Sequence, residues 1–146
     1  MTSFVSLLFA LLLALVPVAA SAEKADRDKP MNIEADNLLH DELKQVSVFT
    51  GHVVLTKGTM VMRGERIEIR TDADGYQFGV ILPEPNKRAF FRQKREGVDE
   101  FMEGEGQRIE YDGKADRVRL IDNAEVRRYR GSVLGDQMTG KLITYD

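Results

Sequence analysis

The chain has 146 residues, enough for one domain with a buried core. It contains no cysteine, which excludes disulfides, thiol chemistry and thiolate metal sites. Its net charge of −3 gives it no general attraction to nucleic acid, so a nucleic-acid partner is not expected.

The N-terminus has the pattern of a secretory signal peptide. Residues 4–18 are apolar except for Ser6 and Pro17, and the small-x-small triplet Ala20-Ser21-Ala22 follows. This pattern predicts a signal peptide over residues 1–22, and hence export to the periplasm. No Lys or Arg precedes the apolar run, which approaches membrane-spanning length, so an uncleaved membrane anchor is the alternative.

The mature part begins with a charged stretch and then changes to short strands. Residues 23–30 end in Pro30 and are predicted to be a flexible arm. From residue 31 onward, apolar and polar positions alternate between turn signals such as Asp74-Gly75 and Asp112-Gly113. Residues 31–146 are therefore predicted to form one all-β domain, a roll or sandwich of short antiparallel strands.

A strand pattern occurs twice in this domain, at an offset of 71 residues. The segments Leu38-x-His40-Asp41, Phe49-x-Gly51-x-Val53-x-Leu55 and Gly64-Glu65-x-Ile67 match, in order, Ile109-x-Tyr111-Asp112, Leu120-x-Asp122-x-Ala124-x-Val126 and Gly135-Asp136-x-Met138. The same positions point inward in both copies. Gly64 and Gly135 fall where the inward parity changes, so both are predicted at bends of the chain. A repeated β-unit of this kind is typical of elongated stacks that bind or bridge.

No group of residues has the spacing of a catalytic or metal site. His40 and His52, the two histidines, lack an acidic cluster at ligand spacing, so no metal and no cofactor are expected. The carboxylates Glu100, Glu103, Glu105 and Glu110 leave open a carbohydrate-active enzyme with paired acids. Basic groups at Arg92/Lys94/Arg95 and Arg127/Arg128/Arg130 are either outward strand positions or phosphate contacts. No catalytic residue is assigned.

The remaining candidate site is the inward apolar set. It allows two interpretations, an ordinary sandwich core or the wall of an open roll that holds acyl chains. The lipid-binding candidates are Met31, Ile33, Leu38, Phe49, Val53, Leu55, Ile67, Phe91, Ile109, Tyr111, Leu120 and Val126.

Several ordered segments resemble one family. They are Pro30-Met31-Asn32-Ile33-Glu34-Ala35-Asp36, Phe49-Thr50-Gly51-His52-Val53-Val54-Leu55-Thr56-Lys57-Gly58, Gly104-Glu105-Gly106-Gln107-Arg108-Ile109-Glu110-Tyr111-Asp112 and Gly135-Asp136-Gln137-Met138. Together they resemble the LptA/OstA family of periplasmic lipopolysaccharide transport proteins. The resemblance covers residues 30–146, nearly all of the mature chain.

The resemblance implies a twisted antiparallel β-jellyroll, open at both ends, that carries lipopolysaccharide without catalysis. Met31, Ile33, Phe91 and Tyr111 fall on family positions associated with lipid contact. The implied partners are the acyl chains of lipid A, inner-membrane LptC-type and outer-membrane LptD-type jellyroll proteins, and further copies of the chain joined head to tail. Two alternatives stay open, a membrane-anchored LptC-type component and a secreted β-roll enzyme.

Overall fold

A computed structural model describes residues 26–95 and 99–146, so the predicted signal peptide lies outside the described residues. The described part contains ten β-strands, all paired antiparallel, which confirms the predicted fold class. The strands are β1 (Met31–Glu34), β2 (Asn37–Asp41), β3 (Val46–Lys57), β4 (Met60–Thr71), β5 (Gln77–Leu82), β6 (Ala89–Lys94), β7 (Glu100–Gly106), β8 (Arg108–Asp112), β9 (Arg117–Arg130) and β10 (Val133–Tyr145). Over these residues, no helix is long and apolar enough to cross a membrane.

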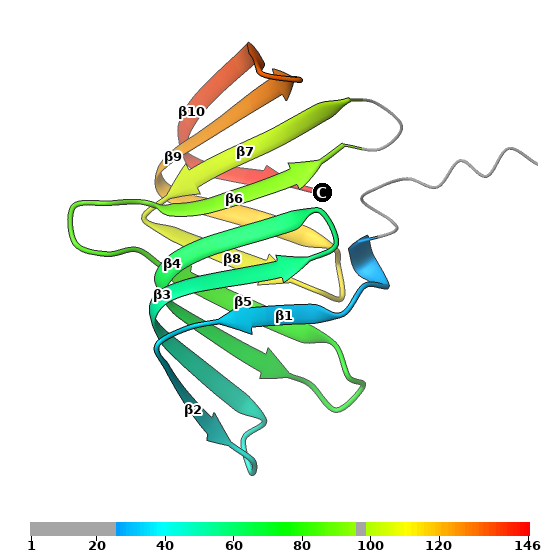
Figure 1. The fold of residues 1–146 in the computed structure, drawn as a ribbon, viewed down its shortest axis with the longest axis vertical. Helices are drawn as coiled ribbons and strands as arrows, with labels where there is room; N and C mark the ends of the chain where they lie inside the picture. The colour runs from blue at the N-terminus through cyan, green and yellow to red at the C-terminus, as the bar shows by residue number, and fades with distance from the viewer. Residues whose placement is uncertain (1–25, 96–98) are drawn as a thin grey trace, which may run out of the picture.

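Four long strands bend in the middle and fold the sheet into two facing layers (Figure 1). The first halves of β3 and β9 and the second halves of β4 and β10 join β2, β5 and β8 in one layer, here called layer A. The other halves of the same strands join β1, β6 and β7 in layer B. The strands stack along the long axis of the molecule, from β2 at one end to β10 at the other.

The bends in β3 and β9 are made by residues with a left-handed backbone. Gly51 and His52 have φ of 81° and 50°, and Asp122 and Asn123, 71 residues later, have φ of 59° and 49°. Such angles are easiest for Gly and Asn and break the ladder to form a bulge. The carbonyls of Gly51 and Asp122 each accept a backbone N–H, from Asp36 and Gln107, at 2.9 Å in both cases.

The repeat seen in the sequence is a structural repeat of two strands. The pairing of β2 with β3, Asn37 with Thr50, recurs between β8 and β9 as Arg108 with Ile121. The third strands differ, because Val53 pairs with Gly64 whereas Ala124 pairs with Gly140.

Of the two glycines predicted at bends, only Gly64 lies where its strand passes from one layer to the other. Gly64 lies where β4 passes from layer B to layer A, and a Cβ there would lie 2.5 Å from the Leu82 carbonyl oxygen. The parity of β10 does change at Gly135, as predicted, but the strand does not change layer there. This glycine lies in a local irregularity of β10, and the strand changes layer between Gly140 and Leu142.

The described part of the predicted flexible arm is anchored. Residues 26–29 form a short helical turn, in which the Lys29 N–H donates to the Asp26 carbonyl at 3.2 Å. Asp26 is buried, and its carboxylate accepts the Thr59 backbone N–H at 2.8 Å. The chain thus enters β1 from a fixed point.

Candidate functional site

The inner face of layer B carries one unbroken row of directly paired residues. The row crosses seven strand segments because each member is the register partner of the next. Residues that are paired across antiparallel strands project to the same face. The row consists of Ile33, Leu55, Met62, Phe91, Gly104, Val126 and Met138.

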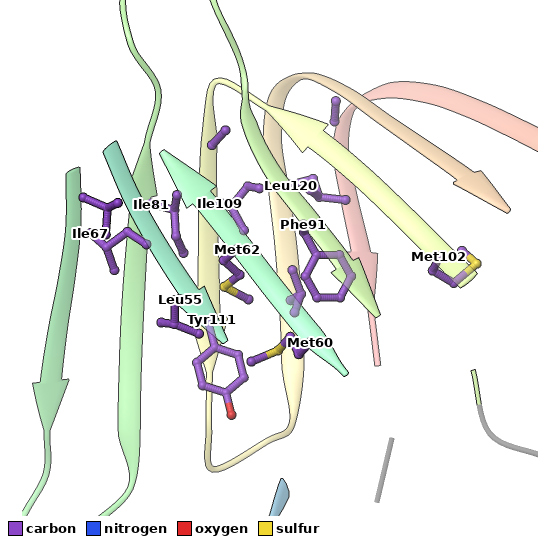
Figure 2. Close-up of a cluster of buried hydrophobic side chains, with 14 of the residues drawn as sticks. Leu55, Met60, Met62, Ile67, Ile81, Phe91, Met102, Ile109, Tyr111 and Leu120 are labelled. Carbon is purple, nitrogen blue, oxygen red and sulfur yellow. The ribbon is translucent and has the colours of Figure 1, made fainter. Parts of the chain in front are cut away.

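Layer A carries a matching row on its own inner face. It also crosses seven strand segments without interruption, and every member is apolar. The row consists of Leu38, Phe49, Ile67, Ile81, Ile109, Leu120 and Ile143. Figure 2 shows members of both rows directed into the space between the layers.

The two rows contact each other across the interior. A Cβ on Gly104 of layer B would lie only 2.9 Å from a methyl carbon of Leu120 of layer A. The rings of Phe91 in layer B and Tyr145 in layer A lie 6.0 Å apart between centroids, tilted by 52°. The middle of the interior is therefore closed and packed like an ordinary core.

The rows become exposed at the two ends of the stack. Leu38 on β2 is 60% exposed, and Met138 on β10 is 54% exposed, although both lie on the inner face beside buried neighbours. Leu38 lies on the inner face, as predicted, but it is exposed rather than covered. Its strand, β2, is the terminal strand of layer A and pairs only with β3 among the described residues. The apolar rows thus continue past the enclosed part at both ends.

The structure brings most of the twelve candidate residues together. Nine of them belong to the two rows: Ile33, Leu38, Phe49, Leu55, Ile67, Phe91, Ile109, Leu120 and Val126. Val53 and Tyr111 are buried beside them, and Met31 packs against the same cluster.

Three buried or partly buried residues of the two rows were not among the candidates predicted from the sequence. They are Met62, Ile81 and Ile143. Ile81 follows a glycine-containing strand start, and Met62 precedes the Gly64 bend, so neither shows a long alternation on its own. Ile143 could have been found, because Ile143-x-Tyr145 repeats the spacing of Ile109-x-Tyr111.

Tyr111 brings a polar group to the edge of this apolar space. Its ring is buried, and its hydroxyl points toward the open side of the sandwich (Figure 2). Burial raises the pKa of the phenol, and the nearby Asp116 carboxylate raises it further. Tyr111 is therefore neutral at physiological pH and can offer a hydrogen bond without a charge.

Five of the six candidate phosphate contacts are paired with carboxylates. Arg92 and Arg127 project outward, whereas Arg128 and Arg130 follow Val126 on the inner face of layer B, at its β10 end. Arg127 lies 3.2 Å from Glu105 and 3.2 Å from Glu125, while Arg95 and Arg130 both contact Glu100, at 2.8 and 3.2 Å. Two more of these arginines also have acidic partners, Arg92 with Glu103 and Arg128 with Asp136. Because the charges of these arginines are already balanced by carboxylates, the arrangement does not favour an anion site.

The same pairing speaks against a carboxylate-based enzyme site. Hydrogen bonding by Arg130, supported by Arg95, lowers the pKa of Glu100, and Arg88 does the same for Glu125. A general acid needs the opposite, a pKa that is raised toward neutrality. These carboxylates are therefore ionised partners of the arginines.

The histidines have local partners. His40 contacts Ser47 at 2.7 Å and Glu42 at 2.9 Å, and His52 contacts Asp36 at 2.8 Å. Over residues 26–95 and 99–146, no three His, Asp or Glu side chains gather in a way that could hold a metal ion.

A surface hollow of about 390 Å³ lies outside the layers, beside the bends. It is lined by both apolar and charged residues, including Arg63, Arg88 and Phe90. Its cations already have partners, because Arg63 stacks on the Phe90 ring at 4.1 Å and Arg88 contacts Glu105 at 2.6 Å. The apolar rows are therefore the stronger candidate site.

The chain is similar in sequence to proteins of one known family. Residues 32–146 match the family model described as LptA/(LptD N-terminal domain) LPS transport protein. The lipopolysaccharide export system protein LptH of Pseudomonas aeruginosa is 30% identical over 140 residues, covering 96% of this chain and 76% of that protein. LptA of Haemophilus influenzae is 28% identical over 140 residues, covering 96% and 78%.

A solved structure shares the fold. It is the crystal structure of LptH, titled as the LptA homologous periplasmic component of the lipopolysaccharide transport device from Pseudomonas aeruginosa. It superposes with a TM-score of 0.72 at 26% identity, covering 84% of this chain and 79% of that chain.

Proposed function

The chain belongs to the LptA family of lipopolysaccharide transport proteins, and from this premise we propose that it carries lipopolysaccharide through the periplasm. In this proposal the acyl chains of lipid A are shielded between the two layers. The protein makes and breaks no covalent bond. The names of the relatives favour this function over a membrane-anchored LptC-type role and over a carbohydrate-active enzyme.

The observation that supports the proposal is the pair of continuous apolar rows. A folded core needs apolar residues in the middle of each layer, but it does not need them to continue past the last facing strand. Here Leu38 and Met138 extend the rows into solvent, so the apolar inner faces are exposed at both ends of the stack. A track of this kind suits a ligand that is longer than the enclosed core.

Acyl chains are the ligands that gain most from such a track. Each methylene kept out of water is worth roughly 0.8 kcal/mol, so a twelve-carbon chain is worth about 10 kcal/mol. A lipid with several such chains cannot cross an aqueous compartment alone. The hydrophobic effect is not directional, so a smooth apolar wall lets the chain slide.

The open strand edges suit end-to-end assembly. Over the described residues, β1 and β2 pair with β3 alone, and β10 pairs with β9 alone. Unpaired edges accept a strand from another molecule by backbone hydrogen bonding. Joining the β2 end of one copy to the β10 end of the next would extend both apolar rows, and such a heterologous contact makes an open filament. LptC-type and LptD-type partners would add at the same edges.

Photo-crosslinking in cells tests the proposal. A photoreactive amino acid at Phe91 or Tyr111 should give a lipopolysaccharide adduct, because both side chains face the interior. The control is Arg119, an exposed residue beside Leu120 on the same strand. Adducts at Arg119 without adducts at Phe91 and Tyr111 would refute the interior path.

A further inference from the structure

The N-terminal turn crosses the open side of the sandwich. The bends lie in the middle of β3 and β9, and the β3–β4 and β8–β9 turns lie on the opposite side of the sandwich (Figure 1). Residues 26–29 lie on that side and contact both layers (Figure 1). We propose that this turn, here called the clasp, holds the layers closed beside Tyr111, and that its release admits an acyl chain. The gating role rests on the proposed function.

The clasp is firmly attached to layer B. The Asp26 side chain is buried, with the residue 4% exposed, and it accepts the Thr59 backbone N–H at 2.8 Å, the Thr59 hydroxyl and the Gln93 amide at 3.1 Å. A buried carboxylate is stable only with such donors around it. Asp26 therefore anchors the turn to the β3–β4 turn and to β6.

The socket for Asp26 is built into the surrounding residues. Gly58 has φ of +59°, and a Cβ there would lie 2.1 Å from an Asp26 carboxylate oxygen, so a larger residue would expel the carboxylate. Gln93 occupies an inward position two residues after Phe91, where an apolar side chain would be expected. Asp26 and Gln93 are the two buried polar residues of the described chain.

The attachment to layer A is weak by comparison. It consists of one ion pair, Arg27 Nη2 to Asp116 Oδ2 at 3.1 Å, and the two side chains are 56% and 33% exposed. Exposed pairs contribute little and are screened by salt. The clasp thus has one fixed end and one releasable end.

The space between the layers is too small for lipid where Gln93 and Asp116, the partners of the clasp, line it. The cavity between the layers at this point has a volume of about 30 Å³ and is lined by Met60, Gln93, Tyr111, Asp116, Val118, Tyr145 and Asp146. The volume is about that of one water molecule. An acyl chain can enter here only if the layers separate, and the bulges at Gly51 and Asp122 are the natural hinge.

The first test measures the clasp without lipid. The chain has no cysteine, so nitroxide labels can be placed at Lys29→Cys and Lys114→Cys, two exposed sites on the clasp and on the β8–β9 turn. Electron spin resonance should give one narrow distance in this background. Adding Arg27→Gln should lengthen and broaden it, whereas Arg27→Lys should preserve it. An unchanged distribution in Arg27→Gln would overturn the clasp.

The second test measures uptake of a lipopolysaccharide with a fluorescent acyl chain by the purified protein. Arg27→Gln and Asp116→Asn should each raise the uptake rate about two- to fivefold, the range expected for one exposed ion pair. Added salt should accelerate the unmodified protein but not the variants. Arg119→Gln, which removes an exposed charge elsewhere on β9, is the control. Equal rates in all variants would overturn the gating role.

If no variant takes up lipid, the proposed function fails as well, and the label distances alone decide whether the clasp exists.

Discussion

At the scale of single residues, Asp26 illustrates what a buried charge requires. Its carboxylate has three hydrogen-bond donors, all uncharged, from Thr59 and Gln93. Asp26→Ala removes the acceptor and leaves these donors without it. The expected loss in the free energy of unfolding is about 1–3 kcal/mol. Urea denaturation measures it, and Asp28→Ala, an exposed neighbour, should change little. Equal stability of the two variants would refute the anchoring role.

His52 gives a second prediction at this scale. The hydrogen bond from His52 to Asp36 raises the pKa of the imidazole above 6.5. A raised pKa in the folded state means that the pair stabilises the fold fully below pH 6.5 and loses this effect as pH rises through the folded-state value. His52→Gln should therefore destabilise the protein more at pH 5.5 than at pH 8.5.

Nuclear magnetic resonance checks the same pair directly. The His52 ring should titrate above 6.5 in the unmodified protein and move down toward 6.5 in Asp36→Asn. A titration that Asp36→Asn leaves unchanged would contradict the assigned cause.

At the scale of elements, the bends in the long strands fold the single sheet into two layers. Gly64→Ala would place a methyl group 2.5 Å from the Leu82 carbonyl oxygen, a backbone atom that cannot move aside. The expected cost is about 1–3 kcal/mol of unfolding free energy. The matched variant is Gly135→Ala, the repeat partner, whose added Cβ would have its nearest contact at 3.4 Å. It should stay within about 0.5 kcal/mol of the unmodified protein. Equal costs would mean that both glycines are bend positions after all.

The sequence repeat predicted the elements only in part, for a physical reason. The pairing of β2 with β3 and of β8 with β9 is local, since a short turn fixes the register. Alternation in these strands was enough to identify Phe49, Ile109 and Leu120 as inward. The position of β10 depends on pairing over its whole length with β9, and the motif around Gly135 carries no signal of the second register shift, between Gly140 and Leu142, where the strand changes layer.

The candidate site shows the same limit. Inward parity can be read from alternation, but coverage cannot: Leu38 lies on the predicted face, and alternation gives no sign that it is exposed. The sequence also carried no indication that residues 26–29 are anchored. Asp26 is one charged residue among several in residues 23–30, and its donors lie far along the chain, at Thr59 and Gln93.

At the scale of the whole molecule, the two exposed row ends predict directional assembly. Leu38→Lys and Met138→Lys each place a charge on one end and leave the other end intact. Under the proposed head-to-tail assembly the unmodified protein should form longer species, and each variant alone should be monomeric. An equal mixture should form dimers and nothing longer, because one usable end of each kind remains. Light scattering after size-exclusion chromatography measures the masses, and dimers of a single variant would contradict the head-to-tail arrangement.

The central claim is that an acyl chain occupies the space between the two layers. The chain has no tryptophan, so a single one can be introduced at Phe91, which faces the interior, or at Phe90, which faces outward against Arg63. Lipopolysaccharide with brominated acyl chains quenches tryptophan only on contact. We expect strong quenching of Phe91→Trp and little quenching of Phe90→Trp. Bound lipid that quenches both equally, or Phe90→Trp alone, would contradict transport between the layers.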